Sequence, residues 1–203
     1  MMEKEGERCG WAGPDPIYLD YHDTEWGVPE YDSRALWEKL VLDGFQAGLS
    51  WITILKKRGN FREAFQGFDP RVIAEWGEED VTRLLGNAGI IRHRGKIEAT
   101  IGNARAWCEI EARDGFDVFL WRYVDFAPLQ TRLMRNEDVP AQTELSLQIS
   151  KDLKKAGFRF CGPTIVYAFM QAVGMVNDHL VGCHVHDRVA ALPRNSKFDL
   201  LNG

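Results

Sequence analysis

Two cysteines and two histidines at opposite ends of the chain could together bind a metal ion. Cys9 and His22 lie near the N-terminus, and His179 and Cys183 lie four residues apart near the C-terminus. One helical turn would place His179 and Cys183 on the same face. Thiolate and imidazole in a tetrahedral set of four suit zinc. Because protein would fill all four positions and leave none for water or substrate, such a site would be structural.

Spacing alone leaves the identity of these ligands open. Neither end of the chain has the close CxxC spacing of a zinc finger. A cysteine or a single histidine among apolar residues is more often packed in a core than bound to metal. His184 and His186 follow Cys183 closely and compete with it as ligands. The residues by themselves therefore indicate a Cys2His2 site without fixing its members.

The N-terminal pair lies in an aromatic segment, residues 9–27, which reads CGWAGPDPIYLDYHDTEWG. Its Gly, Pro and Asp residues are too irregularly spaced for us to predict a regular helix or strand. Such a segment needs an external anchor, and the C-terminal Cys and His are the candidates. We expect a metal to fasten the two ends of the chain together.

Length and composition indicate an ordinary globular protein. With 203 residues, 45% of them hydrophobic, the chain can form one domain or two small lobes that share a core. The charged start MMEKEGER indicates no secretory signal, and four scattered cysteines indicate no disulfide framework, so we expect a reducing compartment, the cytoplasm. No run reaches the roughly 18 apolar residues of a membrane span. The net charge of −5 argues against bulk attraction to nucleic acid but allows a local basic face.

Helices dominate the predicted secondary structure. Asp32 or Ser33 can cap a helix that stops near Gly44, and its apolar residues share one stripe: Leu36, Trp37, Leu40 and Val41. Further helices are expected over residues 51–57 and 60–65. Asp69 followed by Pro70 is a strong helix start. The last residues, 188–203, show little periodicity, and we expect them to be partly disordered.

Basic residues gather in one turn of this acidic chain. Arg92, His93, Arg94 and Lys96 fall within five positions before a long predicted helix. Such a cluster is most often a solvated helix start. It is also the best local candidate for contact with phosphate.

Several long blocks resemble one family. Together CGW, YLDYHDTEWGVPE, FQAGLSWITILKKR, AGIIRHRGKI and GFRFCGPTIVYAFMQAVGMVNDHLVGC resemble the type I 3-methyladenine DNA glycosylases, over residues 8–183. The resemblance implies an all-α, helix-hairpin-helix DNA glycosylase fold with two helical lobes. The domain would span residues 1–187, with a structural zinc on Cys9, His22, His179 and Cys183 joining its termini. The tail, residues 188–203, would follow it.

The resemblance also implies the activity and its site. The chain would be a monofunctional DNA glycosylase that hydrolyses the N-glycosidic bond of 3-methyladenine in alkylated DNA. Tyr21 and Asp43 would act at the base, and the aromatic lining of the pocket would comprise Trp11, Tyr18, Tyr21, Trp26 and Trp51. A flat cationic base gains cation–π attraction there, on the order of 1–2 kcal/mol over its neutral parent. Trp26 is the residue of this set that a core role would explain best.

Contacts with the DNA backbone are implied by the hairpin and by the loop before Trp51. Glycines allow close approach to phosphate, and amide groups at a helix N-terminus bind it without net positive charge. Gly48 and Leu49 would insert into the vacated base stack. The full set of expected DNA contacts is Gly48, Leu49, Arg92, Arg94, Lys96, Gly157, Gly162 and Thr164.

At Asn177 and Asp43 the chain carries residues that bear on the expected chemistry. Many superfamily members carry an essential Asp where this chain has Asn177, and an Asn cannot act as a general base. The reaction would therefore depend mainly on the charged leaving group and on extrusion of the base. The family has a glutamate at the position of Asp43, whose carboxylate reaches about 1.5 Å less far. That departure leaves lesion range open.

These considerations leave three hypotheses. The first is an active 3-methyladenine DNA glycosylase, the second a glycosylase whose lesion preference is altered by Asp43, and the third a catalytically silent damage-recognition protein. A zinc hydrolase is disfavoured because the ligand set leaves no open position and no HExxH motif occurs. The expected partner is double-stranded DNA containing alkylated bases. We expect no organic cofactor, no membrane contact and a monomer.

Overall fold

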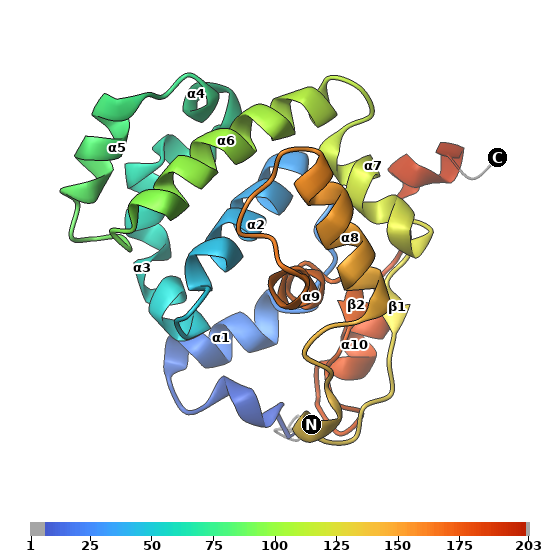
Figure 1. The fold of residues 1–203 in the computed structure, drawn as a ribbon. Helices are drawn as coiled ribbons and strands as arrows, with labels where there is room; N and C mark the ends of the chain where they lie inside the picture. Colours follow the sequence, from blue (N-terminus) through green and yellow to red (C-terminus); the bar gives the residue numbers. More distant parts are fainter. Residues whose placement is uncertain (1–6, 202–203) are drawn as a thin grey trace.

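The computed structural model describes residues 7–201 as an assembly of helices around one core (Figure 1). The α-helices are α1 (Pro16–Thr24), α2 (Ser33–Gln46), α3 (Trp51–Ala64), α4 (Pro70–Ala74), α5 (Glu78–Leu85), α6 (Arg94–Glu111), α7 (Phe116–Trp121), α8 (Glu144–Lys155), α9 (Pro163–Ala172) and α10 (His186–Ala190). The 3₁₀ helices are η1 (Gly10–Ala12), η2 (Gln66–Phe68), η3 (Arg122–Val124), η4 (Asn136–Asp138) and η5 (Ser196–Leu201). The prediction of an all-α fold is confirmed.

A short parallel β pair is the exception to the helical plan. Strands β1 (Leu129–Gln130) and β2 (Val176–Asn177) pair Leu129 with Val176 and Gln130 with Asn177. The pair joins the connection before α8 to the segment after α9.

Helix α9 lies at the centre of the molecule, viewed nearly end-on in Figure 1, with α2 and α8 packed beside it. Its sequence is apolar on most sides, and Val166, Tyr167, Phe169 and Met170 are buried. A helix that is hydrophobic nearly all round belongs in a core. Helices α8 and α9 and the tight turn between them form the predicted hairpin.

The expected caps set the starts of α2 and α4. The Asp32 carboxylate accepts hydrogen bonds from Arg34 N at 3.0 Å and Ala35 N at 2.8 Å. The Asp69 carboxylate accepts one from Arg71 N at 3.0 Å, and Pro70 occupies the first turn. Each cap satisfies amide groups that have no partner within the helix. Helix α2 continues two residues past Gly44, to Gln46.

Two predictions about local structure in the N-terminal half are wrong. Residues 9–27 are not wholly irregular, because Asp15 caps α1 through Ile17 N at 3.2 Å and Pro16 takes the first helical position. The helices expected over residues 51–57 and 60–65 are one continuous helix, α3, ending at Ala64. Burial of Phe61 against Phe45 and Phe65 keeps the chain helical through that stretch.

The two ends of the described chain pack on the body. Glu7 pairs with Cys183 in an isolated parallel bridge, and the Glu7 carbonyl accepts a hydrogen bond from His184 N at 3.1 Å. Phe198 is buried, with its ring 4.9 Å from Phe126 and 5.6 Å from Tyr31. Phe198 thus attaches the tail to the core.

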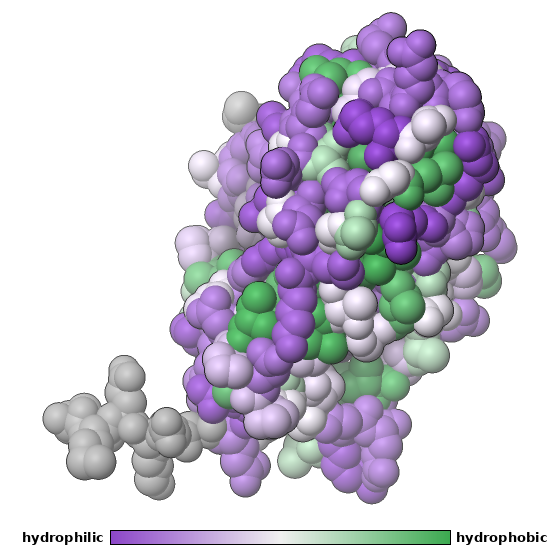
Figure 2. Space-filling view, turned by 90° about the vertical axis from the view of Figure 1, so that its left-hand side faces the viewer, coloured by the Kyte–Doolittle hydropathy of each residue, from purple (hydrophilic) through white to green (hydrophobic). Residues whose placement is uncertain are grey.

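The face of the molecule shown in Figure 2 is mostly hydrophilic with smaller hydrophobic patches. Among residues 7–201, no helix combines the length and apolar character needed to cross a bilayer. Leu49, in the turn between α2 and α3, is 44% exposed.

Candidate functional site

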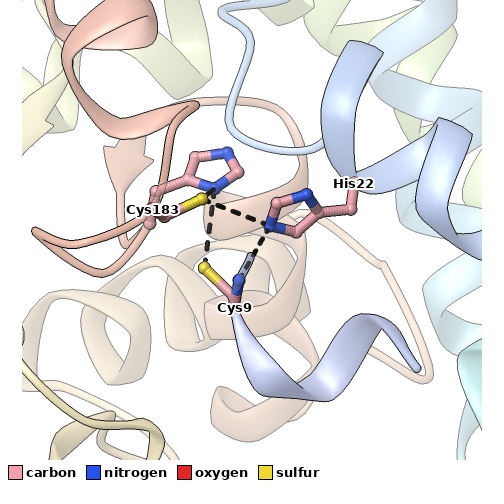
Figure 3. Close-up of side chains that lie close together, drawn as sticks. Cys9, His22 and Cys183 are labelled. Atoms are coloured by element: carbon pink, nitrogen blue, oxygen red, sulfur yellow. Dashed lines mark hydrogen bonds between the residues drawn. The ribbon is translucent and has the colours of Figure 1, made fainter. Parts of the chain in front are cut away.

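Cys9, His22, His179 and Cys183 meet in one buried cluster, with their ligand atoms all within 4.8 Å of one another. Cys183 Sγ lies 3.6 Å from His22 Nε2 and 3.6 Å from His179 Nδ1, and Cys9 Sγ lies 3.7 Å from His179 Nδ1. Figure 3 shows Cys9 and His22 facing Cys183 from the other end of the chain. A tetrahedral zinc site has sulfur–nitrogen edges of about 3.6 Å. The cluster therefore has the donors and the size of a metal site.

Groups around the cluster orient its two imidazole rings. His22 Nδ1 lies 2.7 Å from Asp23 Oδ1, and His179 Nε2 lies 2.8 Å from the Trp26 carbonyl oxygen. When these nitrogens donate, His22 Nε2 and His179 Nδ1 are left to bind a metal. Gly27 permits the approach of His179, because a Cβ at Gly27 would lie 3.0 Å from the ring and its φ is +80°.

The cluster forms through a turn, and the helical turn proposed for residues 179–183 is not present. Cys183 N donates to the Leu180 carbonyl at 2.8 Å, which closes a tight turn. The competing histidines lie outside the set. His184 Nε2 is 3.4 Å from Asp23, while His186 Nδ1 is 2.8 Å from Asp187 and its Nε2 is 3.3 Å from the Thr131 carbonyl.

The aromatic segment and α2 enclose a cavity of about 390 Å³. This volume suits a small planar molecule. Tyr21 and Trp51 face each other with ring centroids 5.5 Å apart, and Trp11 lies 4.9 Å from Trp26. All the residues expected around the base line this one cavity: Trp11, Tyr18, Tyr21, Trp26, Asp43 and Trp51. Trp26 also packs edge-on against His179 at 4.6 Å, so the metal cluster supports the cavity wall.

Lys39 is a cavity residue that the sequence analysis missed. It lies one helical turn before Asp43 on α2, and its ammonium forms an ion pair with Asp43 Oδ1. Its Nζ also lies 3.8 Å from the centroid of the Trp51 ring. Opposite charges four residues apart on a helix predict the ion pair from the sequence. The same spacing does not predict the contact of Lys39 with Trp51.

The polar groups of the cavity are strongly affected by burial. Burial raises the pKa of the Asp43 carboxyl, and the positive charge of Lys39 opposes the rise. Burial lowers the pKa of the Lys39 ammonium, and the Asp43 charge opposes that change. The pKa of Tyr21 lies well above its usual value because of burial and then the charge of Asp43, so the hydroxyl keeps its proton.

Asn177 does not face the cavity, whereas its neighbour Asp178 does. The Asn177 side-chain amide donates to Gln130 Oε1 at 2.9 Å and to the His186 carbonyl at 3.1 Å. Asp178 lines the cavity and accepts hydrogen bonds from the Tyr167 hydroxyl at 2.6 Å and the Gln171 amide at 2.8 Å. Asp178 is not among the residues predicted from the sequence to line the cavity.

The segments expected to contact DNA lie next to one another. The His93 ring lies 6.2 Å from Phe160 in the hairpin, which places the basic turn beside it. Gly157 has φ of +100°, and Asn103 holds the following backbone by accepting from Arg159 N at 2.8 Å. Gly162 caps α9, and Thr164 stands in its first turn. The turn before α3, with Gly48 at φ +82° and exposed Leu49, lies beside the cavity residues Gln46 and Trp51.

Two of the basic side chains are already engaged within the protein. The Lys96 ammonium is buried and donates to the carbonyls of Phe45 at 2.9 Å and Ala47 at 2.7 Å. Lys96 thus satisfies the C-terminal end of α2 and is turned away from solvent. Arg94 pairs with Glu78 at 2.8 Å and Glu98 at 3.2 Å. Arg92 is exposed at the surface of the turn.

Comparison with known proteins relates the chain to enzymes that act on methylated adenine. The family described as methyladenine glycosylase matches residues 11–186. The DNA-3-methyladenine glycosylase 1 of Escherichia coli K12 is 56% identical over 178 residues, which is 87% of this chain and 95% of that protein. The DNA-3-methyladenine glycosylase of Haemophilus influenzae is 50% identical over 177 residues, covering 87% and 96%.

A solved structure of similar shape carries a ligand. It is a substituted 3-methyladenine DNA glycosylase I in complex with 3-methyladenine, 39% identical to this chain, with a TM-score of 0.86. The match covers 93% of this chain and 99% of that one.

Proposed function

We propose that this chain, which belongs to the methyladenine glycosylase family, is a DNA glycosylase that hydrolyses the N-glycosidic bond of 3-methyladenine in alkylated DNA. One observation carries the proposal: a single cavity is lined by aromatic rings and by a buried carboxylate. Those groups are the ones that a flat, positively charged base needs.

Recognition of the base would combine stacking with charge. A base flipped out of the duplex would stack near Tyr21 and Trp51, and Asp43 would attract its positive charge and accept a hydrogen bond from its amino group. Asp43 Oδ2 is buried and has no hydrogen-bond partner among the described residues. A buried carboxylate oxygen without a donor costs about 1–3 kcal/mol, which a bound amino group would offset.

The chemical step would need little help from a general base. Methylation at ring nitrogen 3 gives the base a positive charge, so cleavage of the glycosidic bond releases a neutral leaving group. Asp178 also lines the cavity, and its carboxylate would favour the positive charge that develops on the sugar of a bound nucleotide. Water then adds to the sugar. Asn177 takes no part, since its amide is engaged with Gln130 and the His186 carbonyl.

We place the enzyme among monofunctional glycosylases. A lyase would need a lysine free to attack the sugar. The lysine lining the cavity, Lys39, is paired with Asp43 and lies over Trp51, among the groups proposed for base recognition. The DNA backbone should therefore stay intact, and borohydride should trap no covalent enzyme–DNA product.

Backbone contacts from three adjacent segments would hold the duplex. The hairpin turn at Gly157 and the first amides of α9 at Gly162 and Thr164 would bind phosphate, joined by the exposed guanidinium of Arg92. Leu49, supported by Gly48, would fill the space left by the extruded base. Local contacts of this kind allow a chain of net charge −5 to bind DNA.

The metal site supports a structural zinc. Two thiolates and two imidazoles would supply all four ligands of a tetrahedral zinc, so no position would remain for water or substrate. Zinc would stabilise the attachment of Cys9 and His22 to the C-terminal segment. Trp26 packs on His179, so the same ion would hold one wall of the cavity in place. We also propose a monomer that works in the cytoplasm.

Chromatography of bases freed from methylated DNA tests the function. The protein should release 3-methyladenine well above the rate of spontaneous loss in a matched incubation without protein. Failure to release any methylated base, together with retained binding to damaged DNA, would instead support the catalytically silent recognition protein. Faster release of another methylated base would support altered lesion preference. This second candidate is favoured by the short side chain of Asp43 and by its ion pair with Lys39.

A further inference from the structure

The Lys39 ammonium occupies the place in the cavity that best suits a positive charge. Helix α2 presents Lys39 and Asp43 on one face, and the ammonium is ion-paired with Asp43 Oδ1. The same Nζ lies 3.8 Å from the Trp51 ring centroid, within the range of a cation–π contact. A carboxylate and an aromatic face thus form a seat for a cation, and a side chain of the protein fills it.

The seat is shielded from water. Asp43 is 1% exposed and the Lys39 side chain 15% exposed. Electrostatic interactions are several times stronger in such surroundings than in bulk water. Arg58 and Glu25, whose charges also act on Lys39, pair with each other at 2.7 Å. The Asp178 carboxylate of the same cavity is held by hydrogen bonds of its own. The charge balance of the seat therefore depends on Lys39 and Asp43.

The free energy needed to replace the Lys39 ammonium by a base depends on the charge of that base. If a positively charged base replaces the ammonium, Asp43 keeps a cationic partner. If a neutral base replaces it, Asp43 is left as an unpaired buried charge, and removal of one partner from a buried ion pair is strongly unfavourable. The flexible four-carbon stem of Lys39 allows its head group to move toward solvent.

We propose that Lys39 and Asp43 form a charge-exchange seat in which only a positively charged base can take the place of the Lys39 ammonium. Lys39 is then a specificity-determining residue that excludes undamaged bases. The inference rests on the proposed function in one respect, namely that the flipped base enters this cavity.

Removal of the ammonium should relax this selection. In Lys39→Met, the side chain stays unbranched and nearly as long but loses its charge, so Asp43 has no cationic partner in the free protein. Burial then favours the protonated, neutral form of Asp43, since burial already raises its pKa. A neutral base can enter such a cavity without leaving a charge unpaired. Lys39→Arg retains the positive charge and is the matched control.

Binding of two small probes tests the seat directly. The first is 3,9-dimethyladeninium, a permanent cation that represents the methylated nucleoside, and the second is its neutral parent 9-methyladenine. Quenching of tryptophan fluorescence gives both dissociation constants. Wild type should prefer the cation, Lys39→Met should lower this preference by about tenfold or more, and Lys39→Arg should retain it. A preference in Lys39→Met that equals or exceeds that of wild type would overturn the proposal.

A measurement on wild type alone guards against misfolding of the variant. The rate at which Lys39 is acylated by a water-soluble ester, followed by mass spectrometry, should rise when the cation binds and stay constant with the neutral probe. An unchanged rate at saturating cation, or binding of neither probe, would also overturn the seat. If the wild-type protein releases 3-methyladenine but binds the two probes equally well, the charge-exchange seat is refuted and the proposed activity is not. Selective binding without base release would refute the proposed activity alone.

Discussion

Lys39 Nζ lies 3.8 Å from the centroid of the Trp51 ring. The two residues come from consecutive helices, α2 and α3, whose connecting turn carries Gly48 and Leu49. The side chains proposed to recognise the base and those proposed to replace it in the duplex are therefore linked by a few residues of chain. If that turn moves when DNA binds, the positions of Lys39 and Trp51 in the cavity should change with it.

The carboxylate of Asp43 should be needed for excision. In Lys39→Met, binding of the cationic base should ionise Asp43 and pair with its charge. In the double variant Lys39→Met with Asp43→Asn, the amide still accepts a hydrogen bond but carries no charge, so single-turnover release of 3-methyladenine should fall roughly 10- to 100-fold relative to Lys39→Met. Tyr21→Ala should lower the rate of release by a similar factor, because one of the two rings that stack on the base is removed. Circular dichroism should show both variants folded. Full turnover in both would remove the cavity from the mechanism.

The Cys2His2 cluster should hold one metal ion that stabilises the fold. Cys183→Ala should lose the ion and more than about 4 kcal/mol of stability, which corresponds to a fall in Tm of roughly 10 °C. His184→Ala is the matched control and should keep both, because His184 lies outside the ligand set. Elemental analysis and calorimetry measure the two effects. Wild-type metal content in Cys183→Ala would show that another ligand completes the site.

Acid should release the metal. The ligands bind as thiolate and neutral imidazole, so protons compete with the ion, and the stability it contributes is present near neutral pH and is lost as pH falls. Retention should decline between roughly pH 6 and pH 4, below the usual imidazole pKa. A chromogenic chelator can follow the release. Retention unchanged down to pH 4 would contradict coordination by His22 and His179.

Arg92 and Lys96 should have opposite phenotypes although both belong to the basic turn. Arg92→Ala should weaken DNA binding and reduce the dependence of affinity on salt by about one ion, with an unchanged Tm. Lys96→Met should lower Tm, because the carbonyls of Phe45 and Ala47 lose their donor, and should leave the salt dependence unchanged. Titrations at several salt concentrations distinguish the two. A reversal of these phenotypes would place Lys96 at the DNA.

Leu49 should matter for duplex DNA in particular. Leu49→Ala leaves the cavity intact but shortens the side chain proposed to fill the vacated stack. Excision from a duplex should fall by about tenfold or more, while excision from a single strand should change little, because no stack has to be filled there. Equal losses on both substrates would argue that Leu49 acts on folding or on the cavity.

The sequence was most informative where local chemistry determines local structure. Asp32 and Asp69 cap their helices as predicted, because a short acidic side chain before a helix satisfies its first amides. The same signal at Asp15 and Pro16 was overlooked within a segment dense in Gly and aromatic residues. The turn that brings His179 and Cys183 together could not be distinguished from a helix by spacing alone.

Roles that depend on tertiary packing were harder to predict. Lys96 belongs to a basic cluster in sequence, yet its ammonium caps α2 from another helix. Phe198 is buried by rings from residues far away in the chain, which no local periodicity encodes. Lys39 could be paired with Asp43 from their spacing, but its position over Trp51 required the packing of α2 against α3.

A crystal structure with the cation 3,9-dimethyladeninium bound tests the central claim most directly. The account predicts the base between Tyr21 and Trp51, with its amino group within hydrogen-bond distance of Asp43 Oδ2. Density for the base at any other place on the protein, with this cavity unchanged, would contradict it.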